Sequence, residues 1–219
     1  MYKVTDLFDL SFSRAGAMLA QYTWPHEALK DIQRMIQAIG ESLPAAEVEH
    51  PPEHVWIARD AAVAPTAYLG DYVIVDHRAE IRHCAFIRGS ALIGQNTVVG
   101  NSTELKNVIL FDCVQVPHYN YVGDSILGYH AHMGAGAVTS NVKGDRTPVT
   151  IHDGEEALAT GLKKMGAMLG DWAEIGCNSV LNPGTIIGRN AQVYPLTSVR
   201  GTLPENCIHK GREIVEKHP

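Results

Sequence analysis

Residues 57–105 read IARDAAVAPTAYLGDYVIVDHRAEIRHCAFIRGSALIGQNTVVGNSTEL, and this stretch decides the fold. Every sixth residue in it is a branched aliphatic, and a small or β-branched residue stands four places after each one. Neither an amphipathic helix nor an amphipathic strand has a six-residue period. A repeat this short cannot bury its own apolar residue, so neighbouring repeats must stack into a solenoid with one continuous core. The aliphatic positions are Ile57, Val63, Leu69, Val75, Ile81, Ile87, Ile93, Val99 and Leu105.

The six-residue period predicts a prism in which each repeat supplies a short strand and a corner. Three repeats then complete one turn of about 18 residues, with the aliphatics inside and the small residues at the corners. The pattern resembles the left-handed parallel β-helix, an exception to right-handed crossovers. We therefore expect a mainly β fold: a left-handed parallel β-helix of hexapeptide repeats, with a helical N-terminal cap and an inserted hairpin. The alternative is a run of ordinary strands that align by chance.

Composition limits the possible functions. The chain has 219 residues, of which 45% are hydrophobic and 19% charged, and its net charge is −6. Without a lysine or arginine block, this charge argues against nucleic acid and anionic membranes as partners. No apolar run spans a bilayer, and no signal-peptide layout is present. Four cysteines without CxxC spacing indicate reduced thiols, so we expect a cytoplasmic protein.

The first segment, residues 1–52, does not follow the period. Apolar residues at helical spacing predict a helix from Leu29 to Ile39 that stops at Gly40, and a weaker helix is expected over 14–22. The linker into the solenoid contains Pro44, Pro51 and Pro52. We expect these helices to cap the open end of the β-helix, whose first coil would otherwise expose an edge. Docking of a partner is the alternative.

The β-helix is expected over residues 53–205. Two steps of the period shorten to five residues, from Leu105 to Leu110 and from Val122 to Leu127, beside the most polar part of the wall. An insertion at about 142–168 carries a hairpin near Val149–Ile151. Residues 206–219 are expected to form a tail, with a short charged helix over 210–217.

The most informative segment, residues 101–141, reads NSTELKNVILFDCVQVPHYNYVGDSILGYHAHMGAGAVTSN. It resembles the acetyltransferase domain of bifunctional N-acetylglucosamine-1-phosphate uridylyltransferases and related sugar-1-phosphate enzymes. The resemblance covers about residues 55–205. Their nucleotidyltransferase domain has no counterpart in the sequence, so we do not expect uridylyltransferase activity. The matching elements are Asn101 with Glu104-Leu-Lys106, His118-x-x-Tyr121-Val-Gly-Asp124, Gly134-Ala-Gly136 and Thr139-Ser-Asn141.

The resemblance implies a reaction and a set of roles. An amino-sugar phosphate or nucleotide amino sugar would be N-acetylated from acetyl-CoA, with no metal. His118 would be the general base, because a neutral imidazole accepts a proton at pH 7. Tyr121 completes the catalytic pair and, like Lys106 and Asn141, holds the acceptor. Backbone amides at Gly134 and Gly136 would stabilise the oxyanion.

Two departures from the family leave the acceptor sugar open. His132 stands where many relatives carry asparagine, and we place it among the acceptor-binding residues. The family's basic phosphate ligands beyond Asn141 fall near Thr147 and Thr150, so we expect Arg146 or Lys143 to take their place.

Relatives form trimers, and the resemblance implies that acetyl-CoA lies along the C-terminal coils. We therefore expect a homotrimer with the site in the groove between neighbouring prisms. Ala173, Cys177 and Tyr194 would lie along the pantetheine arm of the coenzyme, and Arg200 would meet its phosphates.

Two other functions stay open. Zinc enzymes of the γ-carbonic anhydrase class use three histidines on a similar β-helix, and five histidines supply candidates. The pair His83 and His118 has the spacing of that class, but Gly123 stands where the third ligand would be. The other possibility is a non-catalytic trimeric scaffold that binds a sugar nucleotide. The histidines are His77, His83, His118, His130 and His132.

Overall fold

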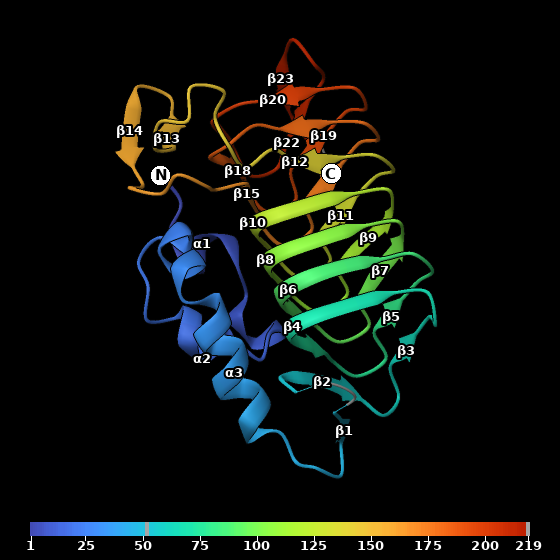
Figure 1. Ribbon diagram of the computed structural model, residues 1–219. Coiled ribbons are helices and arrows are strands. Elements are labelled where there is room, and N and C mark those ends of the chain that lie inside the picture. The colour runs from blue at the N-terminus through green and yellow to red at the C-terminus, as the bar shows by residue number, and fades with distance from the viewer. Residues whose placement is uncertain (51–52, 218–219) are drawn as a thin grey trace.

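The structure is a computed structural model that describes residues 1–50 and 53–217; Pro51 and Pro52 of the expected linker lie outside them. Most of the chain winds into a left-handed parallel β-helix (Figure 1). Val55 pairs with Val73 on the next coil, and Val73 pairs with Ala91, so one coil takes 18 residues. The expected fold class is confirmed.

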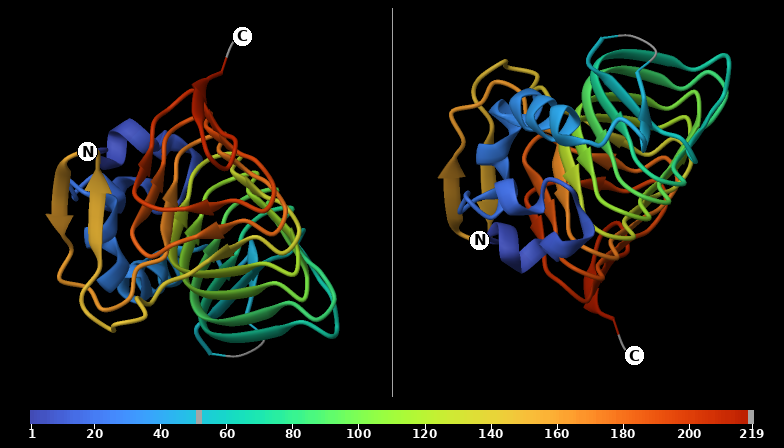
Figure 2. Two further views of the ribbon diagram at one scale, coloured as in Figure 1. Left: turned by 90° about the horizontal axis from the view of Figure 1, so that it is seen from above. Right: turned by 90° about the horizontal axis from the view of Figure 1, so that it is seen from below.

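The coils form a prism with three faces, seen along its length in Figure 2. The first face contains β3 (Ala62–Val63), β5 (Glu80–Ile81), β7 (Val98–Asn101), β9 (Gln115–His118), β11 (His132–Met133), β16 (Glu174–Ile175), β19 (Gln192–Val193) and β22 (Cys207–His209). The second and third faces share four long strands that bend from one to the other: β4 (Tyr68–Val75), β6 (Phe86–Ile93), β8 (Glu104–Leu110) and β10 (Tyr121–Leu127). The second face continues with β12 (Val138–Thr139), β17 (Val180–Leu181) and β20 (Ser198–Val199). The third face also contains β2 (Val55–Ala58), β15 (Ala167–Leu169), β18 (Thr185–Ile187) and β21 (Thr202–Leu203).

We call the bend from the first to the second face the first corner, that from the second to the third face the second corner, and the return the third corner. The shortened repeats of the sequence fall at the second corner. There, β6 has one residue more than β8 between paired positions, and Gly89 lies in this bulge with φ of +131°. Strands β8 and β10 share the shorter bend, and Lys106 and Asp124 lie in it.

The third face carries an outward stripe of apolar side chains that is fully covered. Side chains alternate along a strand, so the residue before each inward aliphatic points outward. On this face the seven apolar residues at such positions are at most 4% exposed. They must therefore be packed against segments outside the β-helix. They are Trp56, Ile74, Leu92, Ile109, Ile126, Met168 and Ile186.

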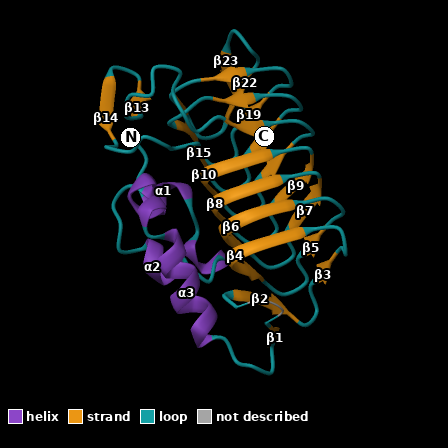
Figure 3. Cartoon of the chain, viewed as in Figure 1, coloured by secondary structure: helices purple, strands orange, loops and turns teal. Residues whose placement is uncertain are grey.

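The N-terminal segment provides most of this cover. It contains α1 (Val4–Leu7), α2 (Gly16–Leu19), α3 (Ile32–Ser42) and two 3₁₀ turns, Leu10–Phe12 and Pro25–Lys30. Helix α3 runs beside β4, β6 and β8 (Figure 3), and a Cβ on Gly40 would lie 2.3 Å from the Trp56 ring. An α-helix is present in each expected region, but α2 covers only Gly16–Leu19 of 14–22, and α3 begins at Ile32, after the 3₁₀ turn that contains Leu29, and continues two residues past Gly40. Their expected place over the open end is wrong: they lie along the third face, because its stripe needs burial.

Short antiparallel strands close the two ends instead. Strand β1 (Val48–Glu49) pairs with β2 of the first coil, and β23 (Ile214–Glu216) pairs with β22 of the last. Such pairing covers edges that would otherwise bind further strands. The short helix expected over 210–217 is therefore wrong, and β22 extends the coils past residue 205. The expected hairpin is present as β13 (Thr150–Asp153) and β14 (Glu156–Ala159), and β13 packs on β18 and β21.

Candidate functional site

A buried carboxylate organises the second corner. Asp124, 3% exposed, accepts hydrogen bonds through Oδ1 from Lys106 Nζ at 2.8 Å and Asn107 Nδ2 at 3.0 Å. Its Oδ2 accepts one from Asn141 Nδ2 at 2.6 Å. Asn141 also donates to Tyr121 Oη at 3.1 Å. The structure thus brings together three of the residues expected to hold the acceptor, Lys106, Tyr121 and Asn141, whereas His132 and Arg146 lie outside this cluster.

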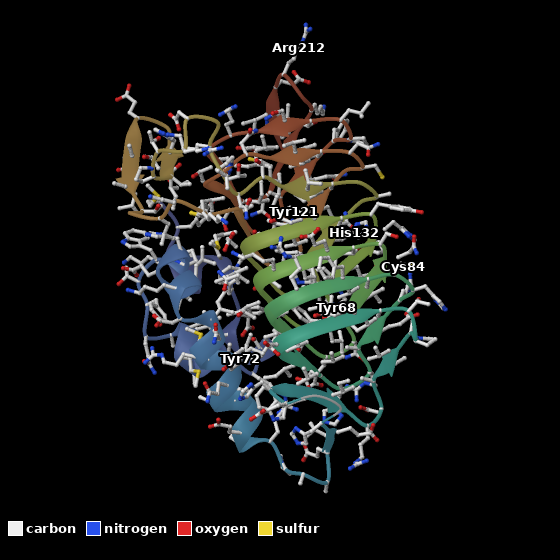
Figure 4. All side chains as sticks on the ribbon, viewed as in Figure 1. Tyr68, Tyr72, Cys84, Tyr121, His132 and Arg212 are labelled. Atoms are coloured by element: carbon white, nitrogen blue, oxygen red, sulfur yellow. The ribbon has the colours of Figure 1, made fainter. Side chains whose placement is uncertain are left out.

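The local sequence explains this convergence. Asp124 and Asn107 have φ of 49° and 56°, a left-handed conformation that Asn and Asp tolerate better than most residues. A Cβ on Gly123 would lie 2.4 Å from Tyr121 Oη, so only glycine lets the phenol lie across the corner. Figure 4 shows Tyr121 on β10, beside the coils that lead into the insertion. The bends and this glycine therefore place the cluster before any ligand binds.

Burial and nearby negative charge keep the Tyr121 phenol neutral. Burial raises its pKa most, and the carboxylates of Asp124 and Glu104 raise it further. Its oxygen accepts a hydrogen bond from Asn141, so its proton is available to a ligand. At neutral pH the cluster offers a phenol donor beside the Lys106 ammonium, which suits an anionic oxygen.

His118 lies at the first corner, on the other side of the second face from Asp124. Its side chain is exposed, and its ring makes no hydrogen bond or ion pair within residues 1–50 and 53–217. Its backbone is held firmly, because its N–H donates to Asn120 Oδ1 at 3.1 Å. Asn120 is buried and donates to the carbonyls of Gly134 and Ala137. The corner is fixed while the imidazole stays open.

The structure does not support Gly134 and Gly136 as oxyanion donors. The Gly134 N–H donates to Ile175 O at 2.7 Å, and the Gly136 N–H to His118 O at 3.0 Å. Both amides are consumed by bonds between coils. Ala135 lies between them, and its N–H makes no hydrogen bond to any other described residue. Ala135 therefore offers the open amide of this corner.

His132 belongs to a pair that the sequence did not reveal. It faces Glu174 across neighbouring strands β11 and β16, with Nδ1 and Glu174 Oε2 2.8 Å apart. The pair borders a groove of about 200 Å³ that Gly134, Cys177 and Pro195 also line. A carboxylate at this distance fixes the ring's orientation. We call the groove that His132 and Glu174 border the coil groove.

The four residues expected to bind acetyl-CoA do not lie together. Ala173 is fully buried, so its side chain cannot touch a ligand. Cys177 is exposed in the coil groove, and Tyr194 is 42% exposed on the same side. Arg200 lies at the second corner, in a different groove beside Lys143. Arg146 is an exposed turn residue of the insertion, with φ of 59°.

The histidines considered as zinc ligands are dispersed. His130 lies in the turn before the strand of His132, and its ring stacks on that of Trp172 with the ring centroids 4.0 Å apart. The His77 Nδ1 atom lies 2.8 Å from Asp60 Oδ1. Across the described part of the chain, no group of three or more His, Cys, Asp or Glu side chains is placed to hold a metal ion.

The sequence pointed to residues expected to contact the substrate, but not to the residues that hold them in place. Asp124 was part of the quoted motif but received no role, although a carboxylate flanked by Lys106 and an asparagine at coil spacing signals an internal pair. Asn107 and Glu174 gave no signal, because corner asparagines and wall glutamates occur throughout such a repeat.

Comparisons with known proteins agree with this architecture. The family described as the GMPPB C-terminal domain matches residues 69–155. The bifunctional protein GlmU of Methanococcus maripaludis is 32% identical over 116 residues, which are 52% of this chain and 28% of that protein. The bifunctional sugar-1-phosphate nucleotidylyltransferase/acetyltransferase of Sulfurisphaera tokodaii is 32% identical over 94 residues, 43% of this chain and 23% of that protein. The chain therefore spans less than a third of the length of these two relatives.

Among solved structures, a mutant perosamine N-acetyltransferase from Caulobacter crescentus, in complex with CoA and GDP-perosamine, is 17% identical. The match covers 75% of this chain and 57% of that one, with a TM-score of 0.36. The sequence matches and the fold confirm the expected resemblance: this is a hexapeptide-repeat β-helix similar to the acetyltransferase part of bifunctional sugar-phosphate enzymes. No helix within the described ranges is long and apolar enough to cross a lipid bilayer.

Proposed function

We propose that this chain transfers the acetyl group of acetyl-CoA to the amine of an amino-sugar phosphate, either free or linked to a nucleotide. The observation that carries the proposal is the Asp124 cluster at one edge of the second face, with the open imidazole of His118 at the other edge. The cluster supplies anion ligands in a fixed arrangement, and His118 supplies an acceptor for a proton. The bifunctional relatives, one of them named for both sugar-1-phosphate and acetyltransferase activities, support the same reaction class.

In this proposal the two corners divide the work. Lys106 and Tyr121 hold the phosphate of the acceptor, and Asn141 keeps the phenol in place. The amine then lies toward His118, which removes its proton as nitrogen attacks the thioester carbonyl. The Ala135 N–H is placed to donate to the oxygen on which negative charge develops. His132, oriented by Glu174, contacts the substrate in the coil groove.

The proposal places acetyl-CoA along the coil groove, past Cys177 and Tyr194. It also includes a homotrimer. The third face is covered by the N-terminal segment, which leaves the first two faces for neighbouring copies. The second face exposes Tyr68 (58%) and Phe86 (42%), whose rings lie 5.4 Å apart. A neighbouring prism would bury this pair. The cytoplasm suits the four cysteines, which are unpaired within the described chain.

The test is thiol release from acetyl-CoA with glucosamine 1-phosphate and galactosamine 1-phosphate as acceptors. We expect turnover on at least one, and His118→Ala should lower it by about 10²–10⁴-fold without unfolding the protein. His83→Ala is the matched control, because His83 is another exposed histidine of the first corner. Near-normal turnover by His118→Ala would refute its role as base. Absence of turnover on any free or nucleotide-linked amino sugar would favour the binding scaffold.

A further inference from the structure

A groove at the second corner leads away from the Asp124 cluster toward the C-terminal coils. It is formed where the insertion leaves Asn141 and folds back beside the prism, and we call it the insertion groove. Its volume of about 610 Å³ is in the range of small-molecule sites. The polar residues that line it include Ser140, Lys143, Thr150, His152, Asn182 and Arg200.

The insertion groove contains an uncompensated positive charge. Arg200 is exposed, and its guanidinium makes no ion pair or hydrogen bond to any residue of 1–50 and 53–217. Lys143, across the groove, lies 3.5 Å from Asp145 and donates to Thr147. Two cations therefore face one carboxylate. A guanidinium with its donors unused is well suited to phosphate oxygens.

A second groove, on the other side of the Asp124 cluster, differs from the insertion groove in the pairing of its cations. It has about 660 Å³ and runs toward the first coils, with Arg88 and Lys106 in its wall. Arg88 is paired with Glu104 at 3.0 Å, and Lys106 with Asp124 at 2.8 Å. Both of its cations already have carboxylate partners. An anionic group in addition to the phosphate at Lys106 and Tyr121 therefore binds more favourably in the insertion groove.

The spacing of the coils fits an extended ligand. Val138 pairs with Val180, and Val180 with Ser198, so Asn141 and Arg200 follow strands two coils apart. Neighbouring strands are about 4.8 Å apart, which gives a rise of about 10 Å. Tyr121 pairs with Val138, so a phosphate at Tyr121 lies about three coils, or about 14 Å, from the strand of Arg200. An acceptor held there approaches Arg200 only if the molecule extends past its first phosphate along the coils. Beyond it, Val142 and Pro183 supply apolar surface.

We propose that the insertion groove binds the nucleoside diphosphate of a nucleotide-linked amino sugar, which makes that molecule the acceptor in place of a free sugar phosphate. This rests on the proposed function. The phosphate attached to the sugar lies at Tyr121 and Lys106, Arg200 and Lys143 hold the second phosphate, and the nucleoside lies along the insertion. Arg200 then serves the acceptor and not the coenzyme, because the coil groove with His132 and Cys177 lies on the opposite side of the second face.

The test is direct binding of UDP and GDP, glucosamine 1-phosphate and CoA to the full chain by calorimetry. Arg200→Ala should weaken UDP or GDP at least tenfold, while CoA binding changes less than twofold. Arg200→Lys should recover part of the affinity. Arg212→Ala, at the C-terminal tip (Figure 4) and outside the residues that line the insertion groove, is the control for surface charge. Both substitutions are at exposed residues, so the variants should unfold at the wild-type temperature.

CoA contains a diphosphate too, so the CoA measurement distinguishes a groove for the nucleotide-linked sugar from a groove for the coenzyme. If Arg200→Ala weakens CoA and leaves UDP and GDP unchanged, the groove belongs to the coenzyme and the proposal is wrong. If the wild-type chain binds neither nucleotide at millimolar concentration, it is also wrong. Arg200-dependent nucleotide binding supports the groove even if acetyl transfer fails. Turnover of free sugar phosphates alone, without nucleotide binding, supports the proposed reaction and refutes this inference.

Discussion

The first and second corners border the same face of the prism, yet they are built in opposite ways. At the second corner, side chains bond to one another around buried Asp124. At the first corner, the hydrogen bonds near His118 involve the backbone and Asn120, and the imidazole is left open. The second corner is thus preorganised for a ligand, whereas the first is rigid in its backbone and adjustable at its reactive group.

This difference has a physical reason. Holding an anionic group benefits from cations fixed in advance, because ordering long side chains upon binding costs free energy. A general base must instead lose hydrogen bonds to protein or water before it can accept a proton from a substrate. We therefore expect substitutions within the Asp124 cluster to affect folding and activity together, and substitutions of the side chains exposed at the first corner to affect activity alone.

Asp124→Asn should give the largest effect. The amide preserves the shape but replaces one carboxylate oxygen by an NH2 group, which faces a donor whether it lies toward Lys106 or toward Asn141, and it leaves the ammonium without its carboxylate. Breaking a buried ion pair on one side costs about 3–5 kcal/mol, so we expect the free energy of unfolding to fall by about 3 kcal/mol. Activity should fall at least 100-fold. Denaturant unfolding and thiol release measure the two effects.

Asp71→Asn is the control for this variant, because Asp71 is an exposed carboxylate at the same corner. Its free energy of unfolding should change by less than about 0.5 kcal/mol. An unchanged denaturation midpoint for Asp124→Asn would show that the cluster does not stabilise the fold. The supposed contrast between the corners would then disappear.

Glu174→Gln should give an intermediate effect that is confined to activity. Glu174 is half exposed and holds the His132 ring, so its loss frees the imidazole without opening the core. We expect turnover to fall by about tenfold, as is typical when a supporting partner of an active histidine is removed. The matched control is Glu156→Gln, an exposed glutamate on the hairpin.

A double-mutant cycle with His132→Gln sharpens this second prediction. If Glu174 acts through His132, the second substitution should add little once the first has been made. Additive losses would mean that the two residues act separately. A fall in the unfolding temperature of more than a few degrees would instead make Glu174 a structural residue.

The sequence was sufficient for the β-helix because its signal repeats: each coil contributes the same aliphatic positions, so chance agreement is small. The covered third face had a signal too, three apolar residues in a row as in Val73-Ile74-Val75, where the other faces alternate. The six-residue period alone does not reveal this covered face, and for that reason the helices were expected at the open end. The site was predictable where the motif named residues, as for Tyr121 and Asn141. The sequence did not show that the Gly134 and Gly136 amides bond between coils, or that Arg200 and Cys177 line different grooves, because both depend on pairing between coils.

Titration of Tyr121 should give the smallest effect and the most local test of the second corner. Burial and the carboxylates of Asp124 and Glu104 raise the pKa of this phenol above its ordinary value of 10.0. A raised pKa means that the folded chain keeps the proton where the unfolded chain releases it, so this group's contribution makes stability fall as pH rises above 10. The phenolate absorbance of the wild type minus that of Tyr121→Phe isolates this residue among the tyrosines. In Asp124→Asn the pKa should move down toward the ordinary value, because the second-largest cause of the shift is removed while burial remains. An unchanged pKa in that variant would mean that Asp124 does not act on the phenol electrostatically, and that burial and Glu104 keep the phenol protonated.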